Sequence, residues 1–410
     1  MAKEIKDVVV GLDIGTAKVM AVVAEVMPDG ELRVAGLGVA TTHGLKRGVV
    51  VNIDATVQSI QQALKEAEMM AACKIESVFT GITGSHIRGQ NSTGMVIVRD
   101  QREVSPADVA RVVETAKAIN IPNDQRVLLV EPQEFIIDGH EVKEPVGMSG
   151  SRLEVKVHIV TGAQSAAENI LKCVRRCGLE VERLVLNPSA SSAGVLTQDE
   201  RELGVVLVDI GAGTTDVAIF TDGSIRHTAV IPIAGDLITS DIAMALRTPT
   251  KDAEEIKLQY GVAKQLLADP LAQLEVPGLG DRAPRMLSRQ ALAGVIEPRV
   301  EEIYSLVQQV IRQSGFEELL SSGVVITGGS SVMPGMVELG EDIFLKPVRR
   351  GLPLYNGPLH DMVANPRSAT VMGLLEEARL SRARGVKAAG QAGSVKSWFG
   401  RLRDWFLGNF

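Results

Sequence analysis

An internal near-repeat, with copies about 196 residues apart, constrains the fold of this 410-residue chain more than any other feature. The first copy is VVVGLDIGTAKVMAVVAEVMPDGELRV at 8–34, and the second is VVLVDIGAGTTDVAIFTDGSIRHT at 205–228. Each copy predicts a strand, an Asp-Ile-Gly turn, a strand, an Asp-Gly hairpin turn and a third strand. A chain of this length also exceeds what one hydrophobic core usually organises. The sequence therefore predicts two lobes of similar design, each opening with an apolar strand that ends in Asp-Ile-Gly.

The segments between and after the two copies mix helical and strand patterns. Between the copies, helices are predicted at 54–72, 106–119 and 165–177, the last with a capping box of Ser165 and Glu168 and a stop at Gly178; strands are predicted at 77–82, 94–99, 126–137 and 152–160. After the second copy we expect a helix at 236–246, a helix-rich section at 251–313 broken by a Pro/Gly loop at 270–284, a strand and turn at 324–336, and a last body helix at 365–383.

These patterns predict an α/β protein of two lobes. We assign to the first lobe residues 1–83, 163–195 and 360–380, with an inserted α+β subdomain at 84–162. The second lobe has a core at 196–250 and 314–359 and a helical subdomain at 251–313. A linker of small residues at 381–393 and an amphipathic helix at 394–410 follow.

Three glycine-rich turns carry the chemistry that the sequence suggests. Glycine lets backbone N–H groups approach an anion closely, hydroxyls add donors, and a carboxylate at a strand end can hold hydrated Mg²⁺. Taken alone, each of them is also consistent with an ordinary tight turn. Facing one another, the first two would clamp phosphates from both sides, with Asp13 and Asp209 converging on one metal ion. The other residues concerned are Gly15, Thr16, Ala17 and Lys18; Gly211, Ala212, Gly213, Thr214 and Thr215; and Gly328, Gly329, Ser330 and Ser331.

In this order and separation the three turns resemble the two phosphate loops and the adenosine loop of the superfamily of actin, the Hsp70 chaperones and sugar kinases. The resemblance implies an actin-like two-lobed fold that binds ATP with Mg²⁺. It also matches DAEEIK at 252–257 to a stretch that contacts adenosine in bacterial actins, which points to Glu254 and Lys257. The alternative is that this pattern is only the solvated face of a helix.

The segment LVLNPSASSAGVL at 184–196 resembles the first helix that connects the lobes in this superfamily. Asn187 stands where filament-forming and chaperone relatives carry Glu or Gln to orient the attacking water. Asparagine can hydrogen-bond a water but cannot act as a base. We therefore expect at most slow ATP hydrolysis. The catalytic residues stay open at this point, with Asp13, Asn187 and Asp209 as candidates.

The last part of the chain is basic and carries an aromatic stripe. From Arg379 onward seven basic residues accompany one acid, so this part carries +6 while residues 1–378 carry −13. One helical face would hold Val395, Trp398, Phe399, Leu402, Trp405 and Phe406, with Lys396, Arg401 and Arg403 elsewhere on the helix. A helix docked on the body is the alternative. Bulky aromatics with basic neighbours after a small-residue linker favour a helix that lies in the plane of an anionic membrane.

Actin-like turns, an insertion at 84–162 and a C-terminal amphipathic helix together resemble the FtsA family of bacterial cell-division proteins. Further similar segments are SRLEVKVH at 151–158, DERELGVVLVDIGAGTTD at 199–216 and TSDIA at 239–243. The resemblance implies a peripheral protein on the cytoplasmic face of the inner membrane at the division site. It implies a tether for the tubulin-like protein FtsZ, self-association into protofilaments, and recruitment of later division proteins. It places the contact with the C-terminal tail of FtsZ in 251–313, where Arg289, Arg299 and Glu302 are the candidate residues.

Other functions stay open at this point. The actin-like component of a pilus or secretion assembly shares the turns but does not ordinarily carry its own anchor, and a small-molecule kinase would need a substrate-facing Asp base. The acidic body argues against a nucleic-acid-binding surface. The three cysteines include no CxxC, which disfavours disulfides and zinc. We expect neither a signal peptide nor a membrane-spanning helix, since the apolar runs are too short.

Overall fold

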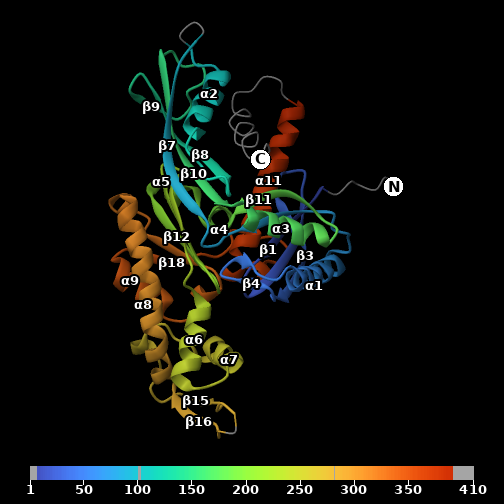
Figure 1. The fold of residues 1–410 in the computed structure, drawn as a ribbon, viewed down its shortest axis with the longest axis vertical. Helices are drawn as coiled ribbons and strands as arrows, with labels where there is room; N and C mark the ends of the chain where they lie inside the picture. The colour runs from blue at the N-terminus through green and yellow to red at the C-terminus, as the bar shows by residue number, and fades with distance from the viewer. Residues whose placement is uncertain (1–6, 100–102, 281, 391–410) are drawn as a thin grey trace.

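A computed structural model describes residues 7–99, 103–280 and 282–390 (Figure 1). The amphipathic helix predicted at 394–410, with all its named membrane-facing residues, lies outside this range. Among the described residues, no helix combines the length and the apolar character that crossing a membrane requires.

Two five-stranded sheets of the same topology form the centres of the two lobes. In each, three antiparallel strands are followed by two further strands that join in parallel beside the first. The first sheet has the order β11 (Glu180–Leu186), β6 (Ser77–Ile82), β1 (Asp7–Ile14), β2 (Lys18–Val26) and β3 (Leu32–Thr41); the second has β18 (Val348–Arg350), β17 (Val324–Thr327), β12 (Val205–Ile210), β13 (Thr215–Thr221) and β14 (Ser224–Ile231). The duplication predicted from two short copies therefore extends over both whole sheets.

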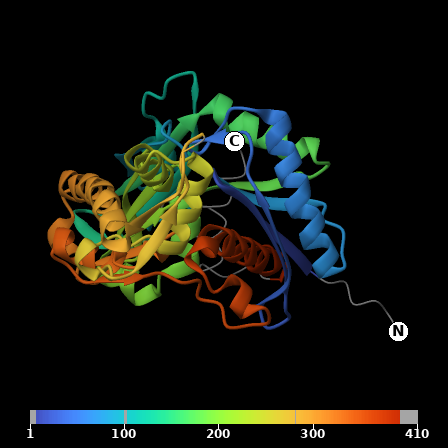
Figure 2. The same cartoon turned by 90° about the horizontal axis from the view of Figure 1, so that it is seen from below.

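Helices cover both faces of the first sheet. Helix α1 (Ile53–Ala71) lies on one face and α11 (Ala369–Gly390) on the other, as Figure 2 shows. The buried side chains of α1 recur every three or four residues, as in Val57, Ile60 and Leu64, so one stripe of the helix packs on the strands. Helix α3 (Gln164–Arg176) follows the insertion and contacts α1.

Helices α4 (Asn187–Val195) and α11 cross closely, and α4 contacts strands of both sheets. Glycine permits this approach, because a Cβ on Gly373 would lie 1.7 Å from the carbonyl oxygen of Ala190, and one on Gly194 would lie 2.6 Å from that of Ala369. The crossing brings Thr370, in the first turn of α11, to Asp209 at the end of β12. The start of α11 is thus fixed against the second lobe.

The insertion forms a separate sheet of order β7 (Arg88–Ile97), β10 (Arg152–Ala163), β8 (Gln125–Ile137) and β9 (His140–Val142), covered by α2 (Pro106–Lys117). Ser105 caps α2 in a capping box with Asp108, and a core of its own fills the space between helix and sheet. The chain enters and leaves this subdomain from the first lobe, yet the sheet docks on β14 of the second lobe. Gln133 donates to the carbonyl of Ile225, and Arg226 pairs with Glu134 at 2.6 Å.

His158 is fully buried at this junction. Its Nδ1 lies 2.6 Å from Asn91 Oδ1 and its Nε2 lies 2.9 Å from Thr228 Oγ1. Burial, with a smaller effect from His227, lowers the pKa of His158 to about 3. Below pH ~6.5 the unfolded chain binds a proton that the folded chain excludes, so stability falls with decreasing pH between about 6.5 and 3.

We expect His158→Gln to reduce this acid sensitivity. The variant should lose less stability between pH 6.5 and 4, with a slope smaller by up to about 1.4 kcal/mol per pH unit, because glutamine binds no proton in either state. Denaturant unfolding at a series of pH values measures the slope. His140→Gln, which changes an exposed histidine of β9, is the matched control. An unchanged slope in His158→Gln would contradict the assignment.

The second lobe carries the predicted helical subdomain, at the lower end of Figure 1. It contains α6 (Gly235–Leu246), α7 (Thr250–Tyr260) and the long α8 (Arg289–Ser314), with α9 (Met336–Phe344) packed against α8. The segment predicted as a Pro/Gly loop at 270–284 contains strand β15 (Gln273–Val276), which forms a hairpin with β16 (Arg285–Ser288) directly after the segment. Leu274 and Val276 of β15 alternate inward to the core. The remaining short elements are β4 (Leu45–Lys46), β5 (Val49–Val50), α5 (Gln198–Leu203), α10 (His360–Val363), η1 (Gln265–Leu267), η2 (Glu317–Leu319), η3 (Gly329–Val332) and η4 (Pro366–Ser368).

Two local predictions were wrong. Ser165 and Glu168 form no capping box, because β10 runs directly into α3, which therefore begins one residue earlier; Glu168 instead accepts a hydrogen bond from Gln164. Helix α11 continues to Gly390 and takes in most of the stretch predicted as a linker. Alanine and lysine are good helix formers, and a helix that has already started extends at little cost.

Candidate functional site

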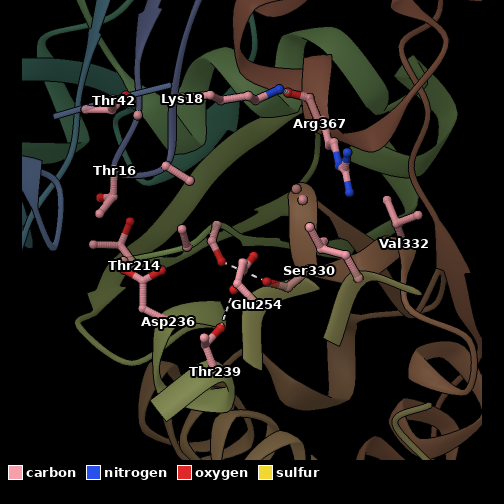
Figure 3. A pocket seen from close by; sticks show the side chains of 18 of the residues that line it. Thr16, Lys18, Thr42, Thr214, Asp236, Thr239, Glu254, Ser330, Val332 and Arg367 are labelled. Carbon is pink, nitrogen blue, oxygen red and sulfur yellow. Dashed lines mark hydrogen bonds between the residues drawn. The ribbon is translucent and has the colours of Figure 1, made fainter. Parts of the chain in front are cut away.

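A cavity of about 910 Å³ lies between the two lobes, with the three glycine-rich turns in its walls (Figure 3). Its volume falls in the range of small-molecule binding pockets. The sequence-predicted residues that line it are Asp13, Gly15, Thr16, Ala17, Lys18, Asn187, Asp209, Gly211, Ala212, Gly213, Thr214, Glu254, Lys257, Gly328, Gly329 and Ser330.

The first two turns have equivalent geometry. Gly15 N donates to the carbonyl of Lys18 at 3.0 Å, and Gly211 N donates to the carbonyl of Thr214 at 2.9 Å. The turns also lie against each other, because a Cβ on Gly213 would stand 2.5 Å from Thr16 Oγ1. Thr16 in turn accepts a hydrogen bond from Gly48 N at 3.0 Å. Only glycine at 213 lets the two lobes close to this distance.

Carboxylates from both lobes form the buried floor of the cavity. Burial raises the pKa of Asp13 to about 6, with Lys18 opposing and Asp209 adding to the rise. Burial likewise raises the pKa of Asp209, against the hydrogen bonds from Ser191 and Thr370, and raises that of Asp216. Burial disfavours the charged form of these carboxylates, whereas a nearby cation favours it. The acidic floor is therefore suited to binding a cation.

Three hydroxyls hold these carboxylates in place. Ser191 Oγ donates to Asp209 Oδ2 at 2.5 Å, and Thr370 Oγ1 donates to the same oxygen at 3.2 Å. Thr83 Oγ1, from the first lobe, donates to Asp216 Oδ1 at 2.5 Å. Thr83 and Thr370 lie outside the motifs, and no sequence signal pointed to them. Asp216 follows directly after the second turn, but the equivalent position in the first copy is Met20, so the repeat does not indicate a carboxylate there.

The third turn completes the arrangement through backbone conformation. Gly328 has φ +83°, which only glycine adopts freely, and a Cβ there would lie 2.3 Å from Asp209 Oδ1. Ser330 Oγ donates to the carbonyl of Gly211 at 2.8 Å, which ties the third turn to the second. The three turns therefore form one connected wall.

Two predicted hydroxyls do not face the cavity. Thr215 is buried in β13 and donates to the carbonyl of Ile233 at 2.8 Å, because alternation along the strand turns it away. Ser331 is buried in η3 and donates to the carbonyl of Gly328 at 2.8 Å. Both hydroxyls stabilise the backbone of the turns on the side that faces away from the cavity.

Glu254 and Lys257 of α7 bind each other at the cavity wall, with Lys257 Nζ 2.7 Å from Glu254 Oε2. Lys257 Nζ also donates to Thr239 Oγ1 at 2.8 Å and to the carbonyl of Gly235 at 3.1 Å. The ammonium group is thus committed to joining α7 to α6. The apolar part of the wall comes from neighbouring residues that the motifs did not include: Leu258, Val332, Met333 and Pro334.

Comparison with known protein families gives two matches. The family described as "Cell division protein FtsA" matches residues 206–373, and that described as "SHS2 domain inserted in FTSA" matches residues 84–161. The cell division protein FtsA of Pseudomonas aeruginosa is 56% identical over 409 residues, which cover 98% of each chain. This chain belongs to the FtsA family. The FtsA of Escherichia coli strain K12 is 44% identical over 415 residues, or 99% of each chain.

Solved structures confirm the actin-like fold of this FtsA-family chain. A chain of the PilM-PilN type IV pilus biogenesis complex has a TM-score of 0.65 at 18% identity, over 90% of this chain and 98% of that chain. MreB5 of Spiroplasma citri, solved with AMPPNP, has a TM-score of 0.57 at 14% identity, over 94% of this chain and 100% of that chain. At such identities the likeness is one of fold. Membership in the FtsA family supports a role in cell division. It disfavours the two alternatives, a pilus component and a small-molecule kinase.

The predicted partner residues of the FtsA-family chain lie on α8, away from the cavity. Arg299 makes a bidentate pair with Asp241 of α6 at 2.6 and 3.0 Å and also contacts Glu302, and these hydrogen bonds raise its pKa. Arg289 is half-buried and donates to the carbonyl of Tyr260 at 2.9 Å. Glu302 is exposed. Arg299 therefore has a structural role whatever else it does.

Proposed function

We propose that this protein binds Mg·ATP in the interlobe cavity. The observation that carries the proposal is the meeting of two equivalent glycine-rich turns, one from each lobe, above buried carboxylates. Two buried polar atoms at the cavity wall, Thr42 Oγ1 and Asn187 Oδ1, have no hydrogen-bond partner among the described residues. An unsatisfied group of this kind costs about 1–3 kcal/mol, so a polar ligand or its waters would stabilise the site.

Different residues of the chain would bind different parts of the ligand. The turns at 15–18 and 211–214 would hold the β- and γ-phosphates, and the turn at 328–330 would hold the nucleoside end. Asp13 and Asp209 would hold hydrated Mg²⁺, whose charge neutralises the phosphates and favours the ionised form of both carboxylates. MreB5 of Spiroplasma citri, which shares the fold, was solved bound to AMPPNP, and this supports a nucleotide as the class of ligand.

We propose at most slow hydrolysis for this site. Asn187 begins α4, and a Cβ on Gly81 would lie 2.1 Å from its Oδ1, so the amide is held close against β6. The free Oδ1 can accept a hydrogen bond from a water and orient it. An amide has no affinity for the proton that the water must lose, so the residue positions water without activating it.

We propose that the nucleotide-bound protein tethers FtsZ to the cytoplasmic face of the inner membrane. In this proposal the C-terminal segment binds anionic lipids as a peripheral anchor, the body self-associates into protofilaments, and the FtsZ tail binds within 251–313. Later division proteins are then recruited to the same assembly. Family membership and the basic aromatic segment at 394–410 support the proposal.

The FtsZ contact can be tested with single substitutions on α8. Arg289→Glu should weaken binding of the FtsZ C-terminal tail peptide about fivefold, since one half-exposed charge contributes about 1 kcal/mol. Fluorescence anisotropy of a labelled tail peptide measures the affinity. Arg312→Glu, on the same helix, is the matched control. Arg299 should be changed to Gln, because Glu there would face Asp241 and Glu302 and damage the fold. Unchanged affinity in both Arg289→Glu and Arg299→Gln would rule out this surface.

A further inference from the structure

Residues 366–370, which comprise η4 and the first two residues of α11, contact all three glycine-rich turns at once. The carbonyl of Arg367 accepts a hydrogen bond from Lys18 Nζ, in the first turn, at 2.7 Å. Thr370 Oγ1 donates to Asp209 Oδ2, beside the second turn, at 3.2 Å. The carbonyl of Pro366 accepts from Gly328 N, in the third turn, at 3.2 Å. This short segment therefore lines the cavity as a fourth segment beside the three turns.

The side chain of Arg367 extends from this segment into the cavity. Figure 3 shows its guanidinium pointing inward between the first and third turns. Its Cγ lies 3.7 Å from the position that a Cβ on Gly329 would occupy, so the side chain runs along the open face of the third turn. The residue is exposed, and the part of the chain that the structure describes supplies no ion pair to the guanidinium.

The other cationic groups of the cavity are already engaged. Lys257 pairs with Glu254 at 2.7 Å and Lys251 with Glu255 at 4.0 Å, while Lys18 gives its ammonium to the carbonyl of Arg367. The described lining of the cavity contains six acidic and four basic side chains, so an anionic ligand meets net repulsion there. A guanidinium that no carboxylate neutralises can offset this repulsion. Its fork of N–H donors also suits phosphate oxygens.

We propose that Arg367 binds the phosphate chain of the nucleotide, next to Lys18, and makes residues 366–370 a fourth ligand-binding segment. The inference rests on the proposed Mg·ATP function and extends it to a residue outside the three turns. Burial, together with the charge of Arg367, lowers the pKa of Lys18 to about 8 against the effect of Asp13. A phosphate between the two cations would relieve their mutual repulsion.

The test is calorimetric titration of the full chain with adenosine, ADP and ATP in the presence of Mg²⁺. Arg367→Gln should weaken ADP and ATP binding about tenfold or more and leave adenosine within about twofold, because only the phosphates contact the guanidinium. Arg367→Lys should recover part of the loss, since it keeps the charge without the fork. Arg312→Gln, which removes an exposed guanidinium outside the cavity, should bind all three ligands as the unchanged chain does.

Two results would overturn the inference: equal affinity of Arg367→Gln and the unchanged chain for ADP and ATP, or an equal loss for adenosine. The second would assign the side chain to the base or ribose. Failure of the unchanged chain to bind any nucleotide would instead overturn the proposed function itself, and the inference with it. Since the comparison is made across ligands within each variant, a general loss of folded protein cannot imitate the expected pattern.

Discussion

Asp209→Asn should remove most of the Mg²⁺-dependent gain in ATP affinity, a loss of about 10- to 100-fold. The substitution keeps the shape of the side chain, and its amide oxygen can still accept the hydrogen bonds that Ser191 and Thr370 donate. What it removes is the charge that would hold the hydrated metal ion. ATP binding without Mg²⁺ should be equal or tighter, because one carboxylate fewer repels the phosphates.

Calorimetry with and without Mg²⁺ measures both effects. The unliganded variant should be at least as stable as the unchanged chain, since burial raises the pKa of Asp209 and an uncharged amide avoids that cost. Asp29→Asn is the matched control: it makes the same change in the turn after β2, where Asp29 accepts a hydrogen bond from Glu31 N. Retention of normal Mg²⁺ dependence by Asp209→Asn would refute the assignment of this carboxylate.

Removal of residues 394–410 should release the protein from membranes while leaving the fold and ATP binding intact. The segment contains both tryptophans of the chain, and each large apolar side chain contributes roughly 1.5–3 kcal/mol when fully buried. A basic residue near an anionic surface adds about 1 kcal/mol. Aromatic burial should therefore dominate, and moderate salt should weaken the binding without abolishing it.

Single substitutions separate the two contributions. Trp405→Glu, which puts a charge into the apolar face, should detach the protein more completely than Arg401→Ala, and Trp405→Phe should retain most of the binding. Co-sedimentation with anionic liposomes measures the bound fraction, with thermal unfolding and nucleotide binding followed in parallel. A large loss of thermal stability on truncation would show that the segment packs on the body, and would contradict the hypothesis that it tethers the protein to the membrane.

The site was predictable where its chemistry lies in consecutive residues. Asp13 and Asp209 each follow an apolar strand and precede a glycine turn, so a few neighbours define their place, and both line the cavity. Lys257 also lines the cavity. Its partners on α6 could not be read from the pattern, because they depend on how α6 and α7 pack. Arg367 belongs to none of the sequence motifs, so the sequence did not indicate it.

The sequence by itself determined the two-lobed actin-like plan, since each repeat carries its strand periodicity and turn residues within about 27 consecutive positions. It also determined the family. Only the tertiary structure decided that the insertion, which leaves the first lobe, docks on β14 of the second through His158 and Arg226. It alone decided that residues 366–370, which comprise η4 and the start of α11, reach all three turns. Strand and turn patterns arise from local propensity, whereas these contacts join residues far apart in the chain and require the lobes to be packed first.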